Sequence, residues 1–322
     1  MKSWIALVAA FVFPSIASAQ AFPSKIVRIS VPFSASSGPT VFLQVLAEKL
    51  TKTWGERVII DPKPGASGFL AIESAKNAAP DGHELLIVSN SHVAINPALY
   101  KKLPYDPEKD FVPVALVYRT PYFLAVSAAG PYQSVPALIN AAKTNPGKLS
   151  YGVAFLGSPP HLGGAMFGFL SGTDMVAVPF KEQIQIAVAI ANDDLAWAFS
   201  TVGSALPLMK AGKVKLIAIA SRSRSPAYQE IPTVEQAGGP AGLEVDGLIV
   251  LVAPRGTPPW VVQRINADVT KQLGDADVVE RLRVFGFDAA PPASPEQVAK
   301  LIREETIKYA EQVRRMGLMG TQ

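Results

Sequence analysis

Ser158 and His161 lie three residues apart in the segment FLGSPPHLGG, and a serine hydroxyl beside an imidazole is the minimal unit of a nucleophilic catalyst. A working nucleophile also needs a group that orients the imidazole, and no carboxylate in the sequence is evidently placed for that role. We therefore interpret Ser158 as a residue that caps a helix or binds a ligand. A hydrolase that uses Ser158 and His161 is the alternative hypothesis.

The other ionisable residues do not form the pattern of a metal site. His83, His92 and His161 are not spaced as metal ligands, and the adjacent Asp193 and Asp194 in ANDD are typical of a turn. The sequence has no cysteine, which excludes disulfides, thiolate zinc sites and cysteine nucleophiles. Phosphate-loop, dinucleotide-binding and nucleophile-elbow motifs are absent. We therefore expect no metal, no cofactor and no enzymatic activity.

The segment VPFSASSGPT, residues 31–40, indicates a different chemistry. Apolar residues lead into a run of Ser, Ala, Gly and Pro, and the following VFLQVLAEKL has helical spacing. A strand that ends in a small polar loop before a helix leaves main-chain N–H groups free, and such groups hold anions. The segment predicts an anion-binding loop.

Alternating strand-like and helix-like segments must position this loop. The composition predicts strands at IVRISVPF, RVIIDP and HELLIVSN. Apolar spacing predicts helices between them at TVFLQVLAEKLTKTWG and FLAIESAKNAA. We expect Gly55 to end the first helix and Ser134 to begin another. This rhythm predicts an α/β fold in which ligands bind beyond the carboxyl ends of the strands.

Composition and charge restrict the class of protein. The 322 residues are 49% hydrophobic and 17% charged, with a formal net charge of +4 and scattered Lys and Arg, so nucleic-acid binding is not expected. Lys2, the apolar run WIALVAAFVF and ASA at 17–19 form a signal-peptide pattern. We predict cleavage after Ala19, which would leave a periplasmic protein.

Several segments together resemble one known family. FPSKIVRISVPFSASSGPT, PDGHELLIVSNSHVAINPALYKKLPYDPEKDFVPVALV and NPGKLSYGVAFLGSPPHLGGAMF are similar to the solute-binding proteins of tripartite tricarboxylate transporters, the Bug family. VPFKEQIQ, STVGSALPLMKAGKVKLIAIAS and VAPRGTPPWVVQRINADV follow in the family's order. The resemblance covers essentially the whole mature chain, and the PDGHELLIVSN block is its most specific part.

The resemblance implies a two-lobed periplasmic binding protein of the Venus-flytrap, type II-like kind, each lobe a mainly parallel sheet flanked by helices. After the signal peptide 1–19, lobe 1 would comprise 20–122 and 247–322, and lobe 2 would comprise 123–246. Hinge crossings near 121–123 and 245–248 would allow closure on the ligand. The protein would act as a monomer and deliver its ligand to an inner-membrane permease.

In the family, a ligand carboxylate is held by two loops, one from each lobe, which map here to 34–40 and 154–161. Serine hydroxyls and main-chain N–H groups would bind it without a buried cation. His92 and Arg119 would assist from outside these two loops. The predicted ligand-binding residues are Phe33, Ser34, Ala35, Ser36, Ser37, Gly38, Thr40, Ser91, His92, Ala154, Phe155, Leu156, Gly157, Ser158, His161, Phe180, Ser200, Thr201, Gly247 and Leu248.

Departures from the family pattern bear on the ligand. Thr40 and Ser200 stand where aspartates are frequent, so a ligand amine would lack a counter-charge. Leu248 stands where a bulky aromatic is frequent, which would leave room for a longer or flat ligand. Phe33, Phe155 and Phe180 offer stacking surface, although core packing is the commoner role of such residues; Ser91, Ser200 or Thr201 would hold a second carboxylate.

We therefore expect an amine-free carboxylate, with an aromatic dicarboxylate such as terephthalate as the first choice. A linear dicarboxylate or tricarboxylate, adipate-like or citrate-like, is the alternative. A protein of the same fold that presents its ligand to a signalling receptor is a further alternative, since only the partner would differ.

Overall fold

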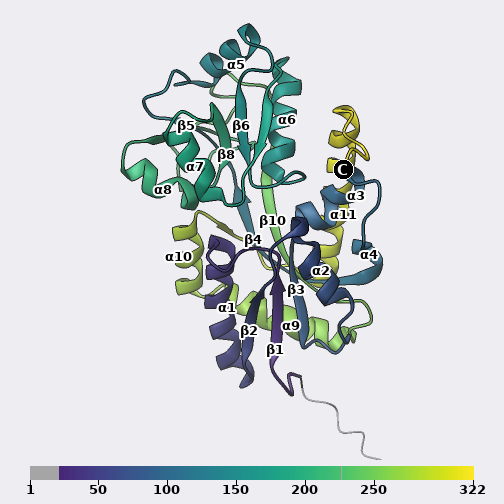
Figure 1. Ribbon diagram of the computed structural model, residues 1–322. Helices are drawn as coiled ribbons and strands as arrows, with labels where there is room; N and C mark the ends of the chain where they lie inside the picture. Colours follow the sequence, from purple (N-terminus) through teal and green to yellow (C-terminus); the bar gives the residue numbers. More distant parts are fainter. Residues whose placement is uncertain (1–21, 226) are drawn as a thin grey trace, which may run out of the picture.

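The computed structural model describes residues 22–225 and 227–322. The predicted signal peptide and its cleavage site after Ala19 lie outside the described residues. Figure 1 shows two bodies, one above the other, each built around a sheet. Within the described ranges, no helix has both the length and the apolar character needed to cross a membrane.

The first sheet forms the centre of the lower body in Figure 1 and has six strands in the order β11-β4-β10-β3-β1-β2. β1 pairs in parallel with β2 and β3, whereas β10 runs antiparallel to both β3 and β4, so β1 to β4 share one direction. The strands are β1 (Val27–Val31), β2 (Val58–Pro62), β3 (Glu84–Ser89), β4 (Phe111–Pro121), β10 (Asp246–Pro254) and β11 (Asp288–Ala289).

The second sheet has five strands in the order β7-β6-β8-β5-β9. β6 pairs in parallel with β7 and β8, and β5 alone runs against its neighbours β8 and β9. The expected α/β fold with two sheets whose strands mostly share a direction is confirmed. The strands are β5 (Phe123–Ser127), β6 (Ser150–Val153), β7 (Val176–Pro179), β8 (Trp197–Ser200) and β9 (Val214–Ile219).

Helices cover both faces of the first sheet, because each helix buries one apolar stripe. The buried side chains of α1, α9 and α10 form one core with one face of the sheet, and those of α2, η2, α3 and α11 form another core with the opposite face. These elements, with η1 and α4, are α1 (Gly38–Trp54), η1 (Ala66–Gly68), α2 (Phe69–Lys76), η2 (Ser91–Ile95), α3 (Asn96–Leu99), α4 (Pro107–Asp110), α9 (Pro259–Leu273), α10 (Ala276–Phe285) and α11 (Pro295–Arg315).

The second sheet is covered in the same way. α5 (Val135–Thr144) and α6 (Pro159–Ser171) bury side chains in a core around Trp197, which is fully buried. α7 (Gln183–Ala191) and α8 (Val202–Lys210) form the core on the other face. Each sheet therefore has its own pair of hydrophobic cores.

The sequence signals for helix ends and turns are confirmed. Gly55 ends α1 with a left-handed backbone (φ 73°), and its N–H bonds the carbonyl of Thr51. Ser134 begins α5, and its hydroxyl accepts the N–H of Ala137 at 3.3 Å. Asp193 has φ 61° in the turn after α7.

The chain passes between the sheets twice, at neighbouring places. β4 ends at Pro121 and β5 begins at Phe123, and the chain returns where β9 leads through a loop to β10. Asp246, the first residue of β10, lies opposite Pro121 in the antiparallel ladder of β4 and β10. Both crossings therefore lie side by side.

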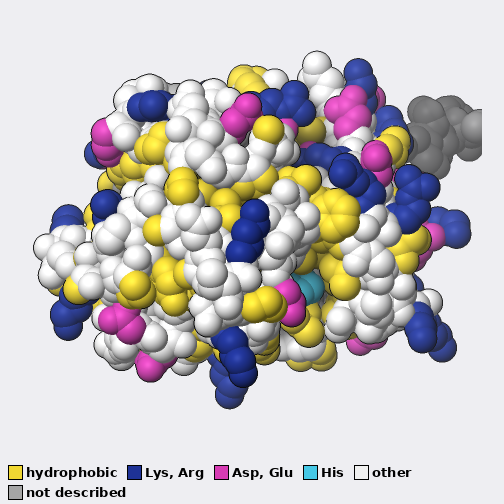
Figure 2. All heavy atoms as spheres, turned by 90° about the horizontal axis from the view of Figure 1, so that it is seen from above, with side chains coloured by type: hydrophobic (Ala, Val, Ile, Leu, Met, Phe, Trp, Pro, Cys, Tyr) yellow, Lys and Arg dark blue, Asp and Glu magenta, His cyan; other side chains and the backbone are white. Residues whose placement is uncertain are grey.

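Positive and negative side chains are mixed over the surface. Figure 2 shows the upper end of the molecule, where Lys and Arg side chains are interspersed with acidic, apolar and uncharged ones. This face has the scattered charge that the composition predicts.

Candidate functional site

The carboxyl ends of parallel strands from the two sheets meet between the two bodies. β1 and β3 are neighbours in the first sheet, so the loop 33–37 after β1 and Ser91 after β3 leave the same edge. In the second sheet β6, β7 and β8 are neighbours, so the loops that follow them also share an edge. Loops at the carboxyl ends of strands are the usual ligand site of such sheets.

The first loop ends in a capped helix. Ser37 is the N-cap of α1; its hydroxyl donates to the carbonyl of Ser34 at 2.8 Å and accepts the N–H of Thr40 at 3.4 Å. The Thr40 hydroxyl lies 3.0 Å from the Ser37 hydroxyl and is fully buried, so Thr40 supports the cap. Thr40 is therefore placed behind the loop.

Main-chain donors of this loop remain free. Among the described residues, no acceptor bonds the N–H groups of Ala35, Ser36 or Gly38. Ala35 and Ser36 are exposed, and Phe33 packs partly against the first core. Free N–H groups at the start of a 17-residue helix favour a carboxylate.

The second loop repeats this arrangement in the second body. Ser158 is the N-cap of α6 and accepts the N–H of His161 at 3.3 Å, while the His161 Nδ1 accepts the N–H of Gly157 at 3.1 Å. Gly157 has φ 86°, and a Cβ there would lie 3.1 Å from Asn96 Oδ1 and 3.0 Å from Leu99 of the first body. The second loop therefore packs directly on the first body.

The same contacts argue against a hydrolase. The Ser158 hydroxyl bonds the main chain of His161, and the imidazole nitrogen Nδ1 bonds Gly157, so the two side chains form no nucleophile–base pair. Burial lowers the pKa of His161, which keeps the ring neutral and suited to accept from the loop. His161 holds the second loop in shape.

Ser91 has a buried, unsatisfied hydroxyl just after the carboxyl end of β3. Ser91 is fully buried at the start of η2, and its Oγ has no hydrogen-bond partner in the described part of the chain. A buried hydroxyl without a partner costs free energy, so such a group indicates a ligand or water that completes it.

His92 supports the first loop from below. Its Nδ1 accepts the N–H of Ser89 at 3.0 Å and lies 3.0 Å from the Ser89 hydroxyl. A Cβ on Gly68 would lie 2.4 Å from His92 Nε2 and 2.9 Å from Pro32, so the ring is wedged beneath the loop. Burial lowers the pKa of His92 to about 4. The ring is fully buried and held through Nδ1 by Ser89.

The end of β8 also carries a hydroxyl cluster. Thr201 caps α8, and its hydroxyl lies 2.9 Å from that of Ser204, which lies 3.0 Å from the fully buried Ser200 hydroxyl. Thr201 is half-buried at the same edge as the second loop. Within this cluster Thr201 and Ser204 are half-buried, whereas Ser200 is fully buried.

Three predicted residues lie in β4 and β10 next to the chain crossings. Leu248 is buried in the core beneath α11, and its N–H bonds Asn90, so its side chain is a core residue. Gly247 lies in β10 against Thr120 and Tyr122. Arg119 pairs with Asp246 at 3.4 Å beside the chain crossings.

The aromatic residues divide between core and boundary. Phe180 follows β7, and it is half-buried against the core of α7 and α8. Phe155, Ala154 and Leu156 are half-buried in the second loop, and Leu156 packs partly against the core around Trp197.

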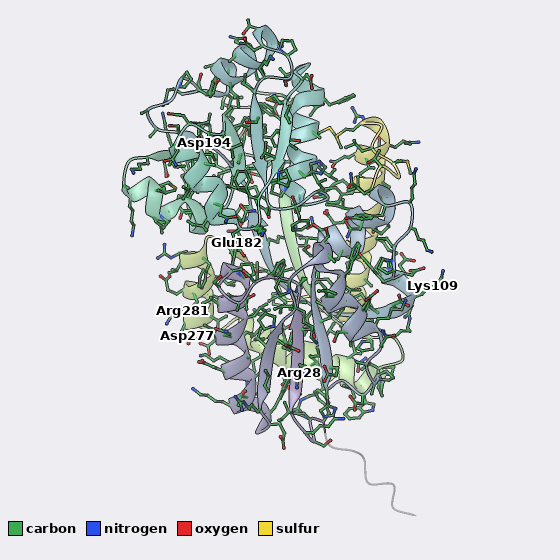
Figure 3. All side chains as sticks on the ribbon, viewed as in Figure 1. Arg28, Lys109, Glu182, Asp194, Asp277 and Arg281 are labelled. Carbon is green, nitrogen blue, oxygen red and sulfur yellow. The ribbon has the colours of Figure 1, made fainter. Side chains whose placement is uncertain are left out.

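Glu182 is a residue of this boundary that the sequence reasoning missed. It begins α7, and its carboxylate lies 3.2 Å from the Ser34 hydroxyl of the first loop, which donates to it. Figure 3 shows Glu182 between the two bodies. Glu182 followed three residues later by Gln185 is a capping pattern, but nothing in the sequence pointed to its bond across the boundary.

No group of three or more His, Cys, Asp or Glu side chains among the described residues is arranged to hold a metal ion. The donors are hydroxyls and main-chain N–H groups, which suit an anionic organic ligand. With two sheets, two chain crossings and one capped loop from each body, the molecule has the fold of a periplasmic binding protein.

Comparison with known proteins identifies the family. Residues 42–318 match the family model TctC, described as the tripartite tricarboxylate transporter family receptor. The chain belongs to this family. It is therefore a solute-binding receptor and not an enzyme, and family receptors take small carboxylates and work with tripartite transporters.

Relatives support the same assignment over nearly the full length. The UPF0065 protein in the tcbD-tcbE intergenic region of Pseudomonas sp. (strain P51) is 32% identical over 90% of this chain and 85% of that protein. Protein BugT of Bordetella pertussis is 28% identical over 93% of this chain and 92% of its own.

Solved structures agree in fold. R. palustris Rpa4515 with adipate has a TM-score of 0.86 and 29% identity over 92% of this chain and 99% of its own. MatC (Rpa3494) from Rhodopseudomonas palustris with bound malate has a TM-score of 0.83 and 30% identity over 91% of this chain and 100% of its own.

Proposed function

We propose that this receptor captures an amine-free dicarboxylate between its two lobes in the periplasm and delivers it to a membrane permease of the tripartite tricarboxylate type. The observation that carries the proposal is one capped loop from each body with main-chain N–H groups that have no acceptor among the described residues: Ala35, Ser36 and Gly38 at α1, and Phe155 and Leu156 in the loop before α6. The start of α6 itself supplies none, because it begins with two prolines, so each loop rather than each helix end would hold a carboxylate group without a cation.

Neutral donors suit a receptor that must also exist empty. An arginine in the boundary would lose its partner whenever the ligand leaves, and an unpaired buried charge is costly. Hydroxyls and N–H groups are satisfied by water in the empty protein. The unpartnered Ser91 hydroxyl is the donor that we assign to the ligand or to such a water.

A linear dicarboxylate such as adipate is the first candidate. The receptors solved with adipate and with malate support it, since both resemble this chain over more than nine-tenths of its length. Leu248 lies in a core, so its size does not argue for a flat ligand. Terephthalate remains the second candidate because Phe33 and Phe180, both half-buried, flank loops of the boundary.

We assign lobe 1 to residues 20–122 and 247–322 and lobe 2 to 123–246, as proposed from the sequence. The hinge would lie at Tyr122 and at 245–248, because the chain passes between the sheets there. Closure of the lobes would bring the two loops onto the ligand. A monomer can perform this motion. Whether the protein serves transport or signalling depends on which partner binds its closed form.

A thermal-shift screen tests the proposal. At about 100 times its Kd a ligand stabilises the folded protein by about 2.7 kcal/mol, which raises the melting temperature measurably. We expect adipate, malate or terephthalate to raise it. Stabilisation by amino acids and by none of the diacids would overturn the ligand assignment.

A further inference from the structure

Glu182 places a negative charge on the first ligand loop. Its carboxylate accepts the Ser34 hydroxyl at 3.2 Å, while its main-chain N–H donates to the Gln185 side chain at 3.2 Å at the start of α7. Within the described residues, no Lys, Arg or His nitrogen lies within 4.0 Å of it, so no ion pair compensates this carboxylate. The charge reaches from the second body to a loop of the first (Figure 3).

This contact changes what the loop offers a ligand. The hydroxyl of Ser34 has one proton, and that proton is directed at Glu182, so Ser34 keeps only its lone pairs for the ligand. A carboxylate close to Ser34 would lose this donor and would also meet a like charge. The free N–H groups of Ala35, Ser36 and Gly38 remain the donors for a ligand carboxylate.

We propose that Glu182 is a specificity-determining residue that limits the negative charge a ligand can bring to the Ser34 side of the boundary. It admits a dicarboxylate whose charged groups lie on the main-chain donors, and it excludes a tricarboxylate, whose third carboxylate would face Glu182. Like charges brought together in a partly desolvated site are costly, so the exclusion is expected to exceed tenfold in affinity. This inference rests on the proposed function.

The test compares adipate with citrate by isothermal titration calorimetry on the wild-type protein and on Glu182→Gln. Glutamine keeps an amide oxygen for the Ser34 hydroxyl, leaves the main-chain bonds to Gln185 in place and removes the charge. We expect the ratio of citrate affinity to adipate affinity to rise at least about tenfold in Glu182→Gln. An unchanged ratio would overturn the inference.

Two control variants separate charge from other effects. Asp194→Asn removes an equal charge beyond the opposite end of α7 and should leave the ratio unchanged. Ser34→Ala removes the hydroxyl but keeps the Glu182 charge, so it should also leave citrate excluded. A ratio that rises equally in Ser34→Ala or in Asp194→Asn would contradict a role for the Glu182 charge.

Failure of the proposed function has a different signature. It would appear as wild-type protein that binds neither acid. In that case, citrate binding by Glu182→Gln would still support the proposal that the Glu182 charge excludes a tricarboxylate. A Glu182→Gln protein that binds neither acid would contradict it.

Discussion

At the residue scale, Ser37 performs two roles with one hydroxyl. It caps α1 by accepting the Thr40 N–H, and it closes the first loop by donating to the Ser34 carbonyl. The neighbouring Ser36 is exposed, and its side chain has no hydrogen bond to another described residue. The Ser37 hydroxyl is therefore structural, whereas the Ser36 hydroxyl is free to bind a ligand.

Replacing Ser37 with alanine should lower the free energy of unfolding by about 1 kcal/mol, because loss of an N-cap acceptor leaves a helix N–H unsatisfied. Urea denaturation measures the change. Ser36→Ala is the matched control and should stay within about 0.5 kcal/mol of the wild type. Equal losses in both variants would show that Ser37 does not act as a cap.

The lowered pKa of His92 predicts that the free energy of unfolding depends on pH. Burial lowers its pKa to about 4, from an ordinary value of 6.5 in the unfolded chain. As the pH falls from about 6.5 towards 4, the unfolded chain therefore binds a proton that the folded protein does not, and stability is lost over that window. The loss is at most about 3 kcal/mol, at 1.36 kcal/mol for each pKa unit.

Denaturant titrations at several pH values, together with an NMR titration of the ring, check this expectation. His161 acts in the same direction, because burial also lowers its pKa. A His92 ring that titrates near pH 6.5 in the folded protein would contradict the buried arrangement.

At the element scale, α8 and α10 form a close contact between the two bodies. A Cβ on Gly203 would lie 2.4 Å from the main-chain oxygen of Phe285, and neither backbone can yield cheaply. Glycine at 203 therefore allows α8 of the second sheet to approach the end of α10.

We expect Gly203→Ala to hold the lobes apart and to weaken dicarboxylate binding about tenfold or more, because the closed form becomes a minor state. Small-angle scattering should show a larger radius of gyration in the presence of ligand. Gly274→Ala is the control, since its nearest neighbour would lie 3.6 Å away. A Gly203→Ala protein that closes and binds normally would refute this role for the contact.

The sequence predicted local structure better than it predicted contacts between distant segments. Gly55, Ser134 and the strand–loop–helix start at 31–40 carry their own turn and cap signals, so their structures follow from nearby residues. The pairing of β4 with β10 joins segments more than a hundred residues apart, and no local pattern encodes it. The bond of Glu182 to Ser34 was missed for the same reason.

Whether a predicted site residue can contact a ligand depends on which way its side chain points. The loop serine Ser34 contacts the second body, whereas Leu248 points into a core and Thr40 is buried behind the loop against Ser37. Family patterns locate a position along a strand or loop, but burial of a single side chain depends on packing from other elements.

At the scale of the whole molecule, ion pairs lie next to the two places where the chain passes between the lobes. Asp246 pairs with Arg119 at 3.4 Å and with Lys308 at 3.3 Å, and Lys308 also bonds Glu305 at 2.8 Å. Burial raises the pKa of Glu305, and the nearby Asp246 raises it further, against the opposing effect of Lys308. α11 is thereby fixed to the first residue of β10, so lobe motion would start from a defined position.

The central claim is that the two lobes close on an amine-free dicarboxylate, and calorimetric titration with adipate and 2-aminoadipate tests it most directly. The two ligands have the same carbon chain and differ by one amine. We predict that adipate binds with one site per chain and more tightly than 2-aminoadipate, because Thr40 and Ser200 supply no counter-charge for the amine and the Glu182 carboxylate already accepts the Ser34 hydroxyl. Tighter binding of 2-aminoadipate, or binding of amino acids without any diacid, would contradict the claim.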